Sequence, residues 1–231
     1  MLAQALTAAT AVRDNRDRAS ALTGLAPYLP AEEQPAVLAQ ALTAATTDPS
    51  DYRCAWTLIQ LAPQLPAYLQ PAALDRALTA ATAIPFDSDR AKALAVLASQ
   101  LPADRQPAVL ARALAAAAAV REDSFGGEER AQTLTELAPH LAADLLSQAL
   151  ELTPKWNIET MRALLQRCRS LFPRDEDVAY VDLLRKTTNG IDRGVCFDLI
   201  SAVAPTVAEI GGVRAVEECI HAVIDVHRWW P

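Results

Sequence analysis

The sequence predicts an all-α fold, specifically a right-handed α-solenoid of about six helical hairpins with a repeat of ~36 residues. The nine residues at positions 2–10, LAQALTAAT, occur unchanged at positions 38–46, a step of 38 − 2 = 36. The same slot recurs as Leu74-Asp-Arg-Ala-Leu78 and Leu110-Ala-Arg-Ala-Leu114, and more loosely as Leu146-Ser-Gln-Ala-Leu150. Ala and Leu carry most of a hydrophobic fraction of 52%, whereas aromatic residues (5%) and glycine (7 residues) are scarce. This balance favours closely packed helices over strands.

Prolines mark the ends of the helices in each hairpin. A first helix ends in the element Leu-Ala-Pro-x-Leu-Pro, whose last proline stops the helix because proline fixes φ and lacks an N–H group. A second helix begins with a proline in its first turn, where that N–H group would have no partner. The stopping prolines are Pro30, Pro66 and Pro102, and the starting prolines are Pro35, Pro71 and Pro107. Other prolines fall inside the last turn of a first helix, where we expect a kink. These are Pro27, Pro63, Pro139 and Pro205.

These signals and the apolar periodicity predict helices along the whole chain. In order, the predicted helices are 2–13, 16–29, 35–46, 50–65, 71–84, 88–101, 107–120, 128–141, 144–154, 158–172, 176–188, 192–207 and 213–230. The second helix of a hairpin carries one apolar stripe, in which small Ala residues let neighbouring helices approach closely. In the helix at 35–46 the stripe consists of Val37, Leu38, Ala41, Leu42 and Ala45.

The repeats are regular over residues 1–155 and divergent over 156–231, where we expect further hairpins and a closing cap in one continuous solenoid domain. The helix at 2–13 matches a second helix that lacks its first helix, which would leave an apolar face exposed. That face consists of Leu2, Ala5, Leu6 and Ala9. We therefore expect the chain to be a fragment or arm of a larger protein, with an unusual N-terminal cap as the alternative.

An acidic-Arg-small triplet opens most of the first helices. The triplets are Asp17-Arg18-Ala19, Asp89-Arg90-Ala91, Glu129-Arg130-Ala131 and Asp192-Arg193-Gly194, and Tyr52-Arg53-Cys54 departs from the pattern at the equivalent slot. We expect the acid to stabilise the first turn through the helix dipole. The Arg is expected to reach an acid in the next hairpin and so to form a ladder.

Paired helices of this length, a proline late in the first helix and these triplets resemble HEAT-type α-solenoids. Tetratricopeptide arrays are the near alternative, which is disfavoured because their repeat is about 34 residues and because the early Trp of that signature is absent from 16–29. The degenerate hairpins, closed by the tail Arg228-Trp229-Trp230-Pro231, also look like the C-terminal sensor arrays of large bacterial signal-transduction (STAND-type) NTPases. This resemblance implies a sensor or scaffold role in bacterial signalling, without catalysis.

Charge and cysteine content narrow the classes of partner. The formal net charge of -7 and a pI near 5.0 repel phosphate backbones, so we expect no nucleic acid partner. Cys54, Cys168, Cys196 and Cys219 form no C-x-x-C pair, which indicates reduced thiols and a cytoplasmic protein. No secretory leader is evident, and the Ala-rich run 113–120 is too short to cross a bilayer, so we expect no membrane partner.

One polar residue per repeat falls at the same slot of each second helix, flanked by a small residue. The candidate partner-binding residues of this column are Gln40, Thr43, Arg76, Thr79, Arg112 and Gln148, which continue Gln4 and Thr7. If the second helices line a groove, Arg76 and Arg112 would anchor an acidic segment of a protein or peptide partner. The alternative is a solvated helix face whose residues bond only to their neighbours.

No catalytic residue, metal ligand or cofactor is predicted. The chain has 3 histidines and neither a nucleophile elbow nor a phosphate-binding glycine loop. Cys219, His221 and His227 share one helix at spacings that do not converge on a metal. We therefore expect a non-catalytic interaction or sensing scaffold. The alternatives are a structural module that self-associates through its N-terminal face, and a degenerate enzyme, which would need perturbed acids in a deep pocket.

Overall fold

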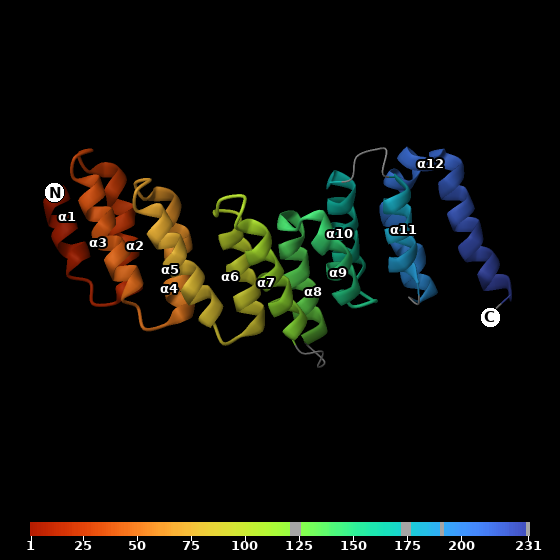
Figure 1. The fold of residues 1–231 in the computed structure, drawn as a ribbon, viewed down its shortest axis with the longest axis horizontal. Helices are drawn as coiled ribbons and strands as arrows, with labels where there is room; N and C mark the ends of the chain where they lie inside the picture. Colours follow the sequence, from red (N-terminus) through yellow and green to blue (C-terminus); the bar gives the residue numbers. More distant parts are fainter. Residues whose placement is uncertain (121–125, 172–176, 190–191, 230–231) are drawn as a thin grey trace. The chain divides into compact units, whose positions relative to one another are not determined.

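A computed structural model describes residues 1–120, 126–171, 177–189 and 192–229, with side chains for all of these except 126, 177–179, 193 and 222–229. The described residues form helices and turns and contain no strand, which confirms the all-α prediction (Figure 1). The α-helices are α1 (Leu2–Thr10), α2 (Asn15–Leu25), α3 (Gln34–Thr46), α4 (Asp51–Leu61), α5 (Gln70–Ala83), α6 (Asp87–Ala98), α7 (Gln106–Ala119), α8 (Gly126–Leu137), α9 (Ala143–Leu152), α10 (Ile158–Leu171), α11 (Asp177–Thr188) and α12 (Arg193–Trp229). Short 3-10 helices follow three of them, η1 (Ala26–Tyr28), η2 (Ala62–Gln64) and η3 (Ala138–His140).

The chain divides into two compact parts, an N-terminal part, Met1–Ala113, and a C-terminal part, Leu114–Pro231. Helix α7 runs across this division. The predicted change at residue 155 concerns only the regularity of the repeats, and the single continuous solenoid domain stays a prediction.

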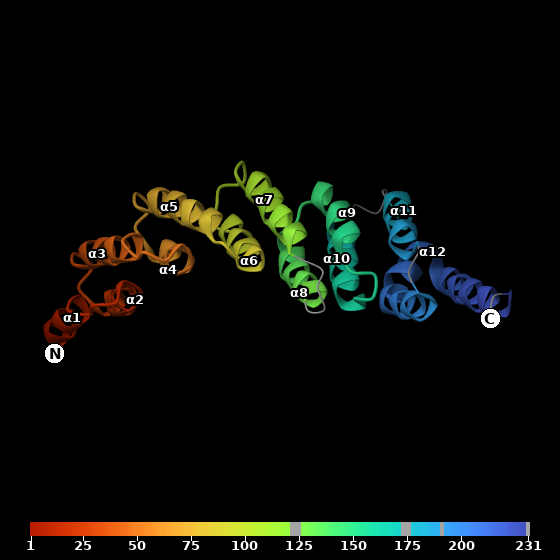
Figure 2. The ribbon, with the colours of Figure 1, turned by 90° about the horizontal axis from the view of Figure 1, so that it is seen from below.

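In the N-terminal part, the two helices of each hairpin pack side by side, α2 with α3 and α4 with α5. Figure 2 shows α3 and α5 in one layer and α2 and α4 in the other. The core between the layers recurs along the sequence, because Leu22, Leu58 and Leu94 are fully buried at equal steps (58 − 22 = 36; 94 − 58 = 36). The predicted apolar stripe of α3 is buried at four of its five positions, whereas Leu42 is half-buried.

Helix α1 packs against α2. Ala9 is buried and Ala5 and Leu6 are half-buried, so only Leu2 of the predicted apolar face is largely exposed, at 45%. The expectation of a fully open apolar face on this helix is therefore wrong, because α2 covers most of it.

The inner prolines of the Leu-Ala-Pro-x-Leu-Pro elements do not kink a helix. Helices α2, α4 and α8 end two residues before the proline, which then occupies a 3-10 turn. An early position in such a turn needs no N–H donor, so proline fits it without losing a hydrogen bond. Where Ser99 replaces the proline, α6 continues to Ala98 and no separate 3-10 helix forms. Pro205 lies inside α12, whose backbone is non-helical only at Gly212.

Two arginines of the triplets, Arg18 and Arg90, bond to backbone carbonyl groups instead of to an acid in the next hairpin. Arg18 Nη1 donates to the carbonyl oxygen of Val12 at 3.1 Å, and Arg90 Nη1 donates to that of Ile84 at 2.8 Å. In each case the guanidinium reaches back to the end of the preceding second helix and fixes the connection between two hairpins. Arg193 lies outside the residues whose side chains are described.

The slot in the second hairpin is Arg53-Cys54-Ala55, one residue later than the sequence suggested. Ala19, Ala55 and Ala91 are fully buried at a common step (55 − 19 = 36; 91 − 55 = 36), which fixes the register. Arg53 therefore occupies the position of the acid, and it does bridge hairpins. Its Nη2 lies 2.6 Å from Asp14 Oδ2 and 2.9 Å from Asp48 Oδ2.

In the C-terminal part, α10 contacts α8, α9, α11 and α12. The hydroxyl oxygens of Thr135 and Thr160, 2.7 Å apart, join α8 to α10. Arg167 Nε donates to the carbonyl oxygen of Leu141 at 3.2 Å. The core around α10 includes Leu164 and Cys168, which are fully buried.

Helix α12 consists of two helical pieces separated at Gly212, which has φ 74° and ψ 175°. Glycine is suited to this position because a Cβ atom disfavours positive φ. The break agrees with the two separate helices predicted at 192–207 and 213–230. The segment Gly194–His221 is long and apolar enough to cross a membrane by length and composition, with 17% of its apolar window buried. The helix break and the charges of Asp198 and Glu209 weigh against a continuous span.

Candidate partner-binding surface

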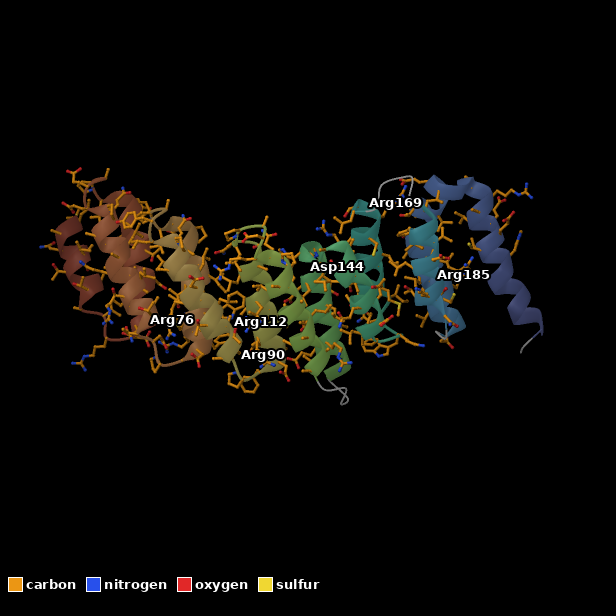
Figure 3. All side chains as sticks on the ribbon, viewed as in Figure 1. Arg76, Arg90, Arg112, Asp144, Arg169 and Arg185 are labelled. Carbon is orange, nitrogen blue, oxygen red and sulfur yellow. The ribbon has the colours of Figure 1, made fainter. Side chains whose placement is uncertain are left out.

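The predicted column of the N-terminal part lies on three second helices. Gln40 and Thr43 come from α3, Arg76 and Thr79 from α5, and Arg112 from α7, and all five residues are exposed. Figure 3 labels Arg76 and Arg112 on these neighbouring helices. Gln148 is also exposed, on α9 of the C-terminal part. The structure thus brings five of the six candidates onto one part of the molecule, and Gln148 is described separately.

A recurring glutamine positions the second helices that carry the column. Gln34, Gln70 and Gln106 each donate from Nε2 to the carbonyl oxygen of a leucine five residues earlier, at 3.0, 2.9 and 2.9 Å. The acceptors are Leu29, Leu65 and Leu101, which follow the first helices and precede the stopping prolines. The same bond therefore closes each hairpin (70 − 34 = 36; 106 − 70 = 36). This role was not predicted, although a glutamine precedes each starting proline in the sequence.

The two arginines of the column have no carboxylate partner among the described residues. Arg112 Nη2 donates to Thr82 Oγ1 on the preceding second helix at 2.9 Å. The charge of Arg76 acts on the thiol of Cys54 and lowers its pKa, against the larger effect of burial. The carboxylate beside it, Asp75, is taken by Arg105 at 2.8 Å. Both guanidinium groups therefore carry an uncompensated positive charge, and that of Arg112 is also held by its hydrogen bond to Thr82.

The threonines of the column have less hydrogen-bonding capacity for a partner than the sequence suggested. Thr43 Oγ1 donates to the carbonyl oxygen of Ala39, and Thr79 Oγ1 to that of Asp75, each at 3.0 Å. Because these hydroxyl protons already bond to the same helix, the threonines can present only acceptor lone pairs and methyl groups to a partner. Specificity on this surface must come mainly from Gln40 and the arginines.

At α1 the column continues into a shallow surface depression of about 440 Å³. Gln4 and Thr7 line it together with three alanines, Ala3, Ala8 and Ala11. Small side chains therefore leave space beside the polar residues at this end of the column.

Burial determines the reactivity of the cysteine thiols. Their apolar surroundings at helical spacing predict core positions for Cys54, Cys168 and Cys196; Cys54 and Cys168 are fully buried, whereas Cys196 is only half-buried. Desolvation raises the pKa of Cys54, although the charge of Arg76 acts in the opposite direction. Desolvation also raises the pKa of Cys168, to about 12. Neither thiol is activated as a nucleophile, because the thiolate is the reactive form.

The C-terminal part contains a cavity of about 250 Å³ that the sequence analysis did not foresee. Lys155, Glu151 and Lys186 line it, and Lys155 Nζ donates to the carbonyl oxygen of Asn189 at 3.4 Å. Over the described ranges, no group of three or more His, Cys, Asp and Glu side chains is arranged to hold a metal ion. His227 lies where side chains are not described.

No known protein family matches this chain, and no similar sequence among curated proteins and no similar solved structure was found.

Proposed function

We propose that this chain is a non-catalytic protein-interaction or sensing scaffold, whose helical hairpins stack as a right-handed α-solenoid with a repeat of ~36 residues. The equal steps between equivalent buried leucines and between the glutamine bonds support the repeat. The resemblance to HEAT-type arrays and to the sensor arms of bacterial signalling NTPases supports a role in a larger cytoplasmic assembly.

One observation carries the proposal. Arg76 and Arg112 are exposed at equivalent slots and have no carboxylate partner in the described structure, and Arg112 is oriented by Thr82. Two exposed, uncompensated guanidinium groups on neighbouring second helices suit an acidic segment of a protein partner, because each can form charge-assisted hydrogen bonds to a carboxylate.

A fluorescein-labelled acidic peptide, acetyl-EELEE-amide, tests this surface by fluorescence anisotropy with the full chain. The double change Arg76→Ala and Arg112→Ala is expected to weaken binding about tenfold, and added salt should weaken binding to the wild type. The matched control, Arg13→Ala with Arg16→Ala, removes the same charge from exposed positions outside the column. Equal affinity of the wild type and the column variant would reject the proposal.

A second candidate is a structural module that self-associates through its N-terminal face. The 45% exposure of Leu2 and the depression lined by Ala3 and Ala8 favour it, because a second copy could cover both. Light scattering of the full chain tests this function. A dimer that is lost in Leu2→Glu supports self-association, whereas a monomer at all concentrations counts against it. Leu6 is half-buried against α2 and is left unchanged so that the variant does not disturb the packing.

A further inference from the structure

A cleft of about 420 Å³ lies between the N-terminus of α4 and the connection from α5 to α6. The connection from α5 to α6 lies at the lower edge of the N-terminal part in Figure 1. Two aromatic rings line it, Tyr52 at 43% exposure and Phe86 at 70%. Two carboxylates, Asp51 and Asp89, line it as well. The cleft thus combines two exposed aromatic side chains with two carboxylates.

One repeat earlier, at the connection from α3 to α4, the position that corresponds to this cleft is filled by a side chain of the protein itself. There, Arg53 places its guanidinium against Asp14 and Asp48, with Nη2 to carboxylate distances of 2.6 and 2.9 Å. The equivalent positions one repeat later are Ser50 for Asp14 (14 + 36 = 50) and Asp89 for Arg53 (53 + 36 = 89). An acid thus replaces the internal cation, and among the described residues no arginine joins two carboxylates across the connection from α5 to α6.

The charges around the cleft remain uncompensated. Within the described part of the chain, neither Asp51 nor Asp89 is paired with a Lys or Arg side chain. Arg90, labelled in Figure 3, is committed elsewhere, since it pairs with Asp87 and donates to the carbonyl oxygen of Ile84 at 2.8 Å. The cleft therefore carries negative charge beside aromatic faces.

An arginine side chain matches this combination. Its planar guanidinium stacks on aromatic rings and forms paired hydrogen bonds with carboxylates, which an ammonium group does less well. Tyr52 is braced for such a contact by Trp56, whose ring centroid lies 6.4 Å away at an interplanar angle of 60°. We propose that the cleft binds an arginine side chain of a partner polypeptide between Tyr52 and Phe86, with Asp51 and Asp89 compensating its charge.

This site is separate from the column of Gln40, Arg76 and Arg112. It has the opposite charge, it lies on the connections between hairpins instead of on the second helices, and it stands even if the column binds nothing.

The test uses the ¹⁵N-labelled full chain and the peptide acetyl-AARAA-amide, with acetyl-AAEAA-amide as the control peptide. Saturable shifts of the backbone amides of Tyr52 and Phe86 are expected with the arginine peptide and not with the glutamate peptide. The corresponding lysine peptide should bind about threefold more weakly, because ammonium stacks less well on aromatic rings. Shifts that are absent, or equal for the arginine and glutamate peptides, overturn the proposal.

Variants assign the effect to the cleft. Asp51→Asn with Asp89→Asn should raise the dissociation constant about tenfold, and Phe86→Ala about threefold. Phe86 is mostly exposed, so Phe86→Ala leaves the core intact. This variant therefore still tests binding in the cleft if the double aspartate variant folds poorly. Asp104→Asn, an exposed acid beyond the far end of α6, should leave binding unchanged. Ser50→Asp with Asp89→Arg recreates the bridge of the preceding connection and should abolish binding. Unchanged affinity in all three cleft variants contradicts the proposal.

Discussion

Arg53 and Asp14, 39 positions apart in the sequence, join consecutive hairpins, with Arg53 Nη2 lying 2.7 Å from Oδ1 and 2.6 Å from Oδ2 of the carboxylate. Asp14 also caps α2, because its Oδ1 accepts from the backbone N–H of Asp17 at 3.0 Å. The carboxylate of Asp14 thus caps the N-terminus of α2 and also links two consecutive hairpins through Arg53.

This pair predicts a pH dependence of stability. The hydrogen bond from Arg53, and after it that from the Asp17 N–H, hold the pKa of Asp14 below its ordinary value of 3.8. The stabilisation by this pair is therefore fully present above the ordinary pKa of 3.8, and it is lost as the pH falls through the lowered pKa of the folded state. Asp14→Asn keeps the helix cap, so it should lower the Tm at pH 7 by no more than about 5 °C, since exposed ion pairs contribute little.

Thermal unfolding followed by circular dichroism between about pH 7 and pH 3 checks this expectation. The Tm difference between wild type and Asp14→Asn should shrink below the ordinary pKa, while Asp104→Asn should show no such trend. A difference that stays constant to the lowest pH would show that Asp14 acts through something other than its charge.

The contribution of one of the hairpin-closing glutamine hydrogen bonds to stability should be measurable in a single variant. Gln70→Met keeps the length of the side chain but leaves the carbonyl oxygen of Leu65 without its 2.9 Å donor. We expect a loss of about 1 kcal/mol in the free energy of unfolding. Urea unfolding of the full chain measures it, with Gln60→Met as the control, because Gln60 is exposed on α4. Equal stabilities of the two variants would mean that water replaces the lost bond.

The helices were predictable because the signals that set them are local. The prolines at the helix starts and the apolar stripe of α3 need only their own few residues, and helices such as α3 and α10 begin within one residue of the predicted positions. The inner prolines were misjudged because sequence alone does not distinguish a kinked last turn from a 3-10 turn that follows the helix.

The candidate sites were less accessible to sequence reasoning, since they depend on contacts between hairpins. A pattern of charges placed the triplet of the second hairpin one residue early, and only the burial of Ala55 fixed its register. The cleft at Tyr52 and Phe86 needed two connections to be brought together in space. The exposure of the column was predictable, whereas the bond from Arg112 to Thr82 was not.

Arg130 should be the most sensitive arginine of the triplets. It is buried to 9% exposure, and its Nη2 donates to the carbonyl oxygens of Ala118, at 3.3 Å, and Val120. Arg130→Met leaves these acceptors unsatisfied and should cost about 2 kcal/mol. Arg130→Lys should recover only part of this loss, because one ammonium cannot reproduce the planar fork. Urea unfolding compares both with Arg162→Met, an exposed arginine of α10, and a loss no larger than in this control would contradict the role.

The buried thiols predict both a labelling pattern and an alkaline limit to stability. Cys54 and Cys168 are fully buried, whereas Cys196 and Cys219 are half-buried. Labelling of the native chain at pH 8 with a thiol-specific reagent, mapped by mass spectrometry, should therefore modify Cys196 and Cys219 first. Cys168 should react only on unfolding, because burial both blocks access and raises its pKa to about 12.

The raised pKa of Cys168 predicts that the protein loses stability as the pH rises. The thiol of Cys168 ionises near its ordinary pKa of 9.0 in the unfolded chain but stays protonated in the folded chain up to about 12. The unfolded state therefore binds fewer protons in this window, so stability should fall as the pH rises from about 9. Cys168→Ala removes this dependence at a cost in packing, and its free energy of unfolding should fall less steeply between pH 9 and 10 than that of the wild type. Parallel curves would show that Cys168 does not contribute to the alkaline loss.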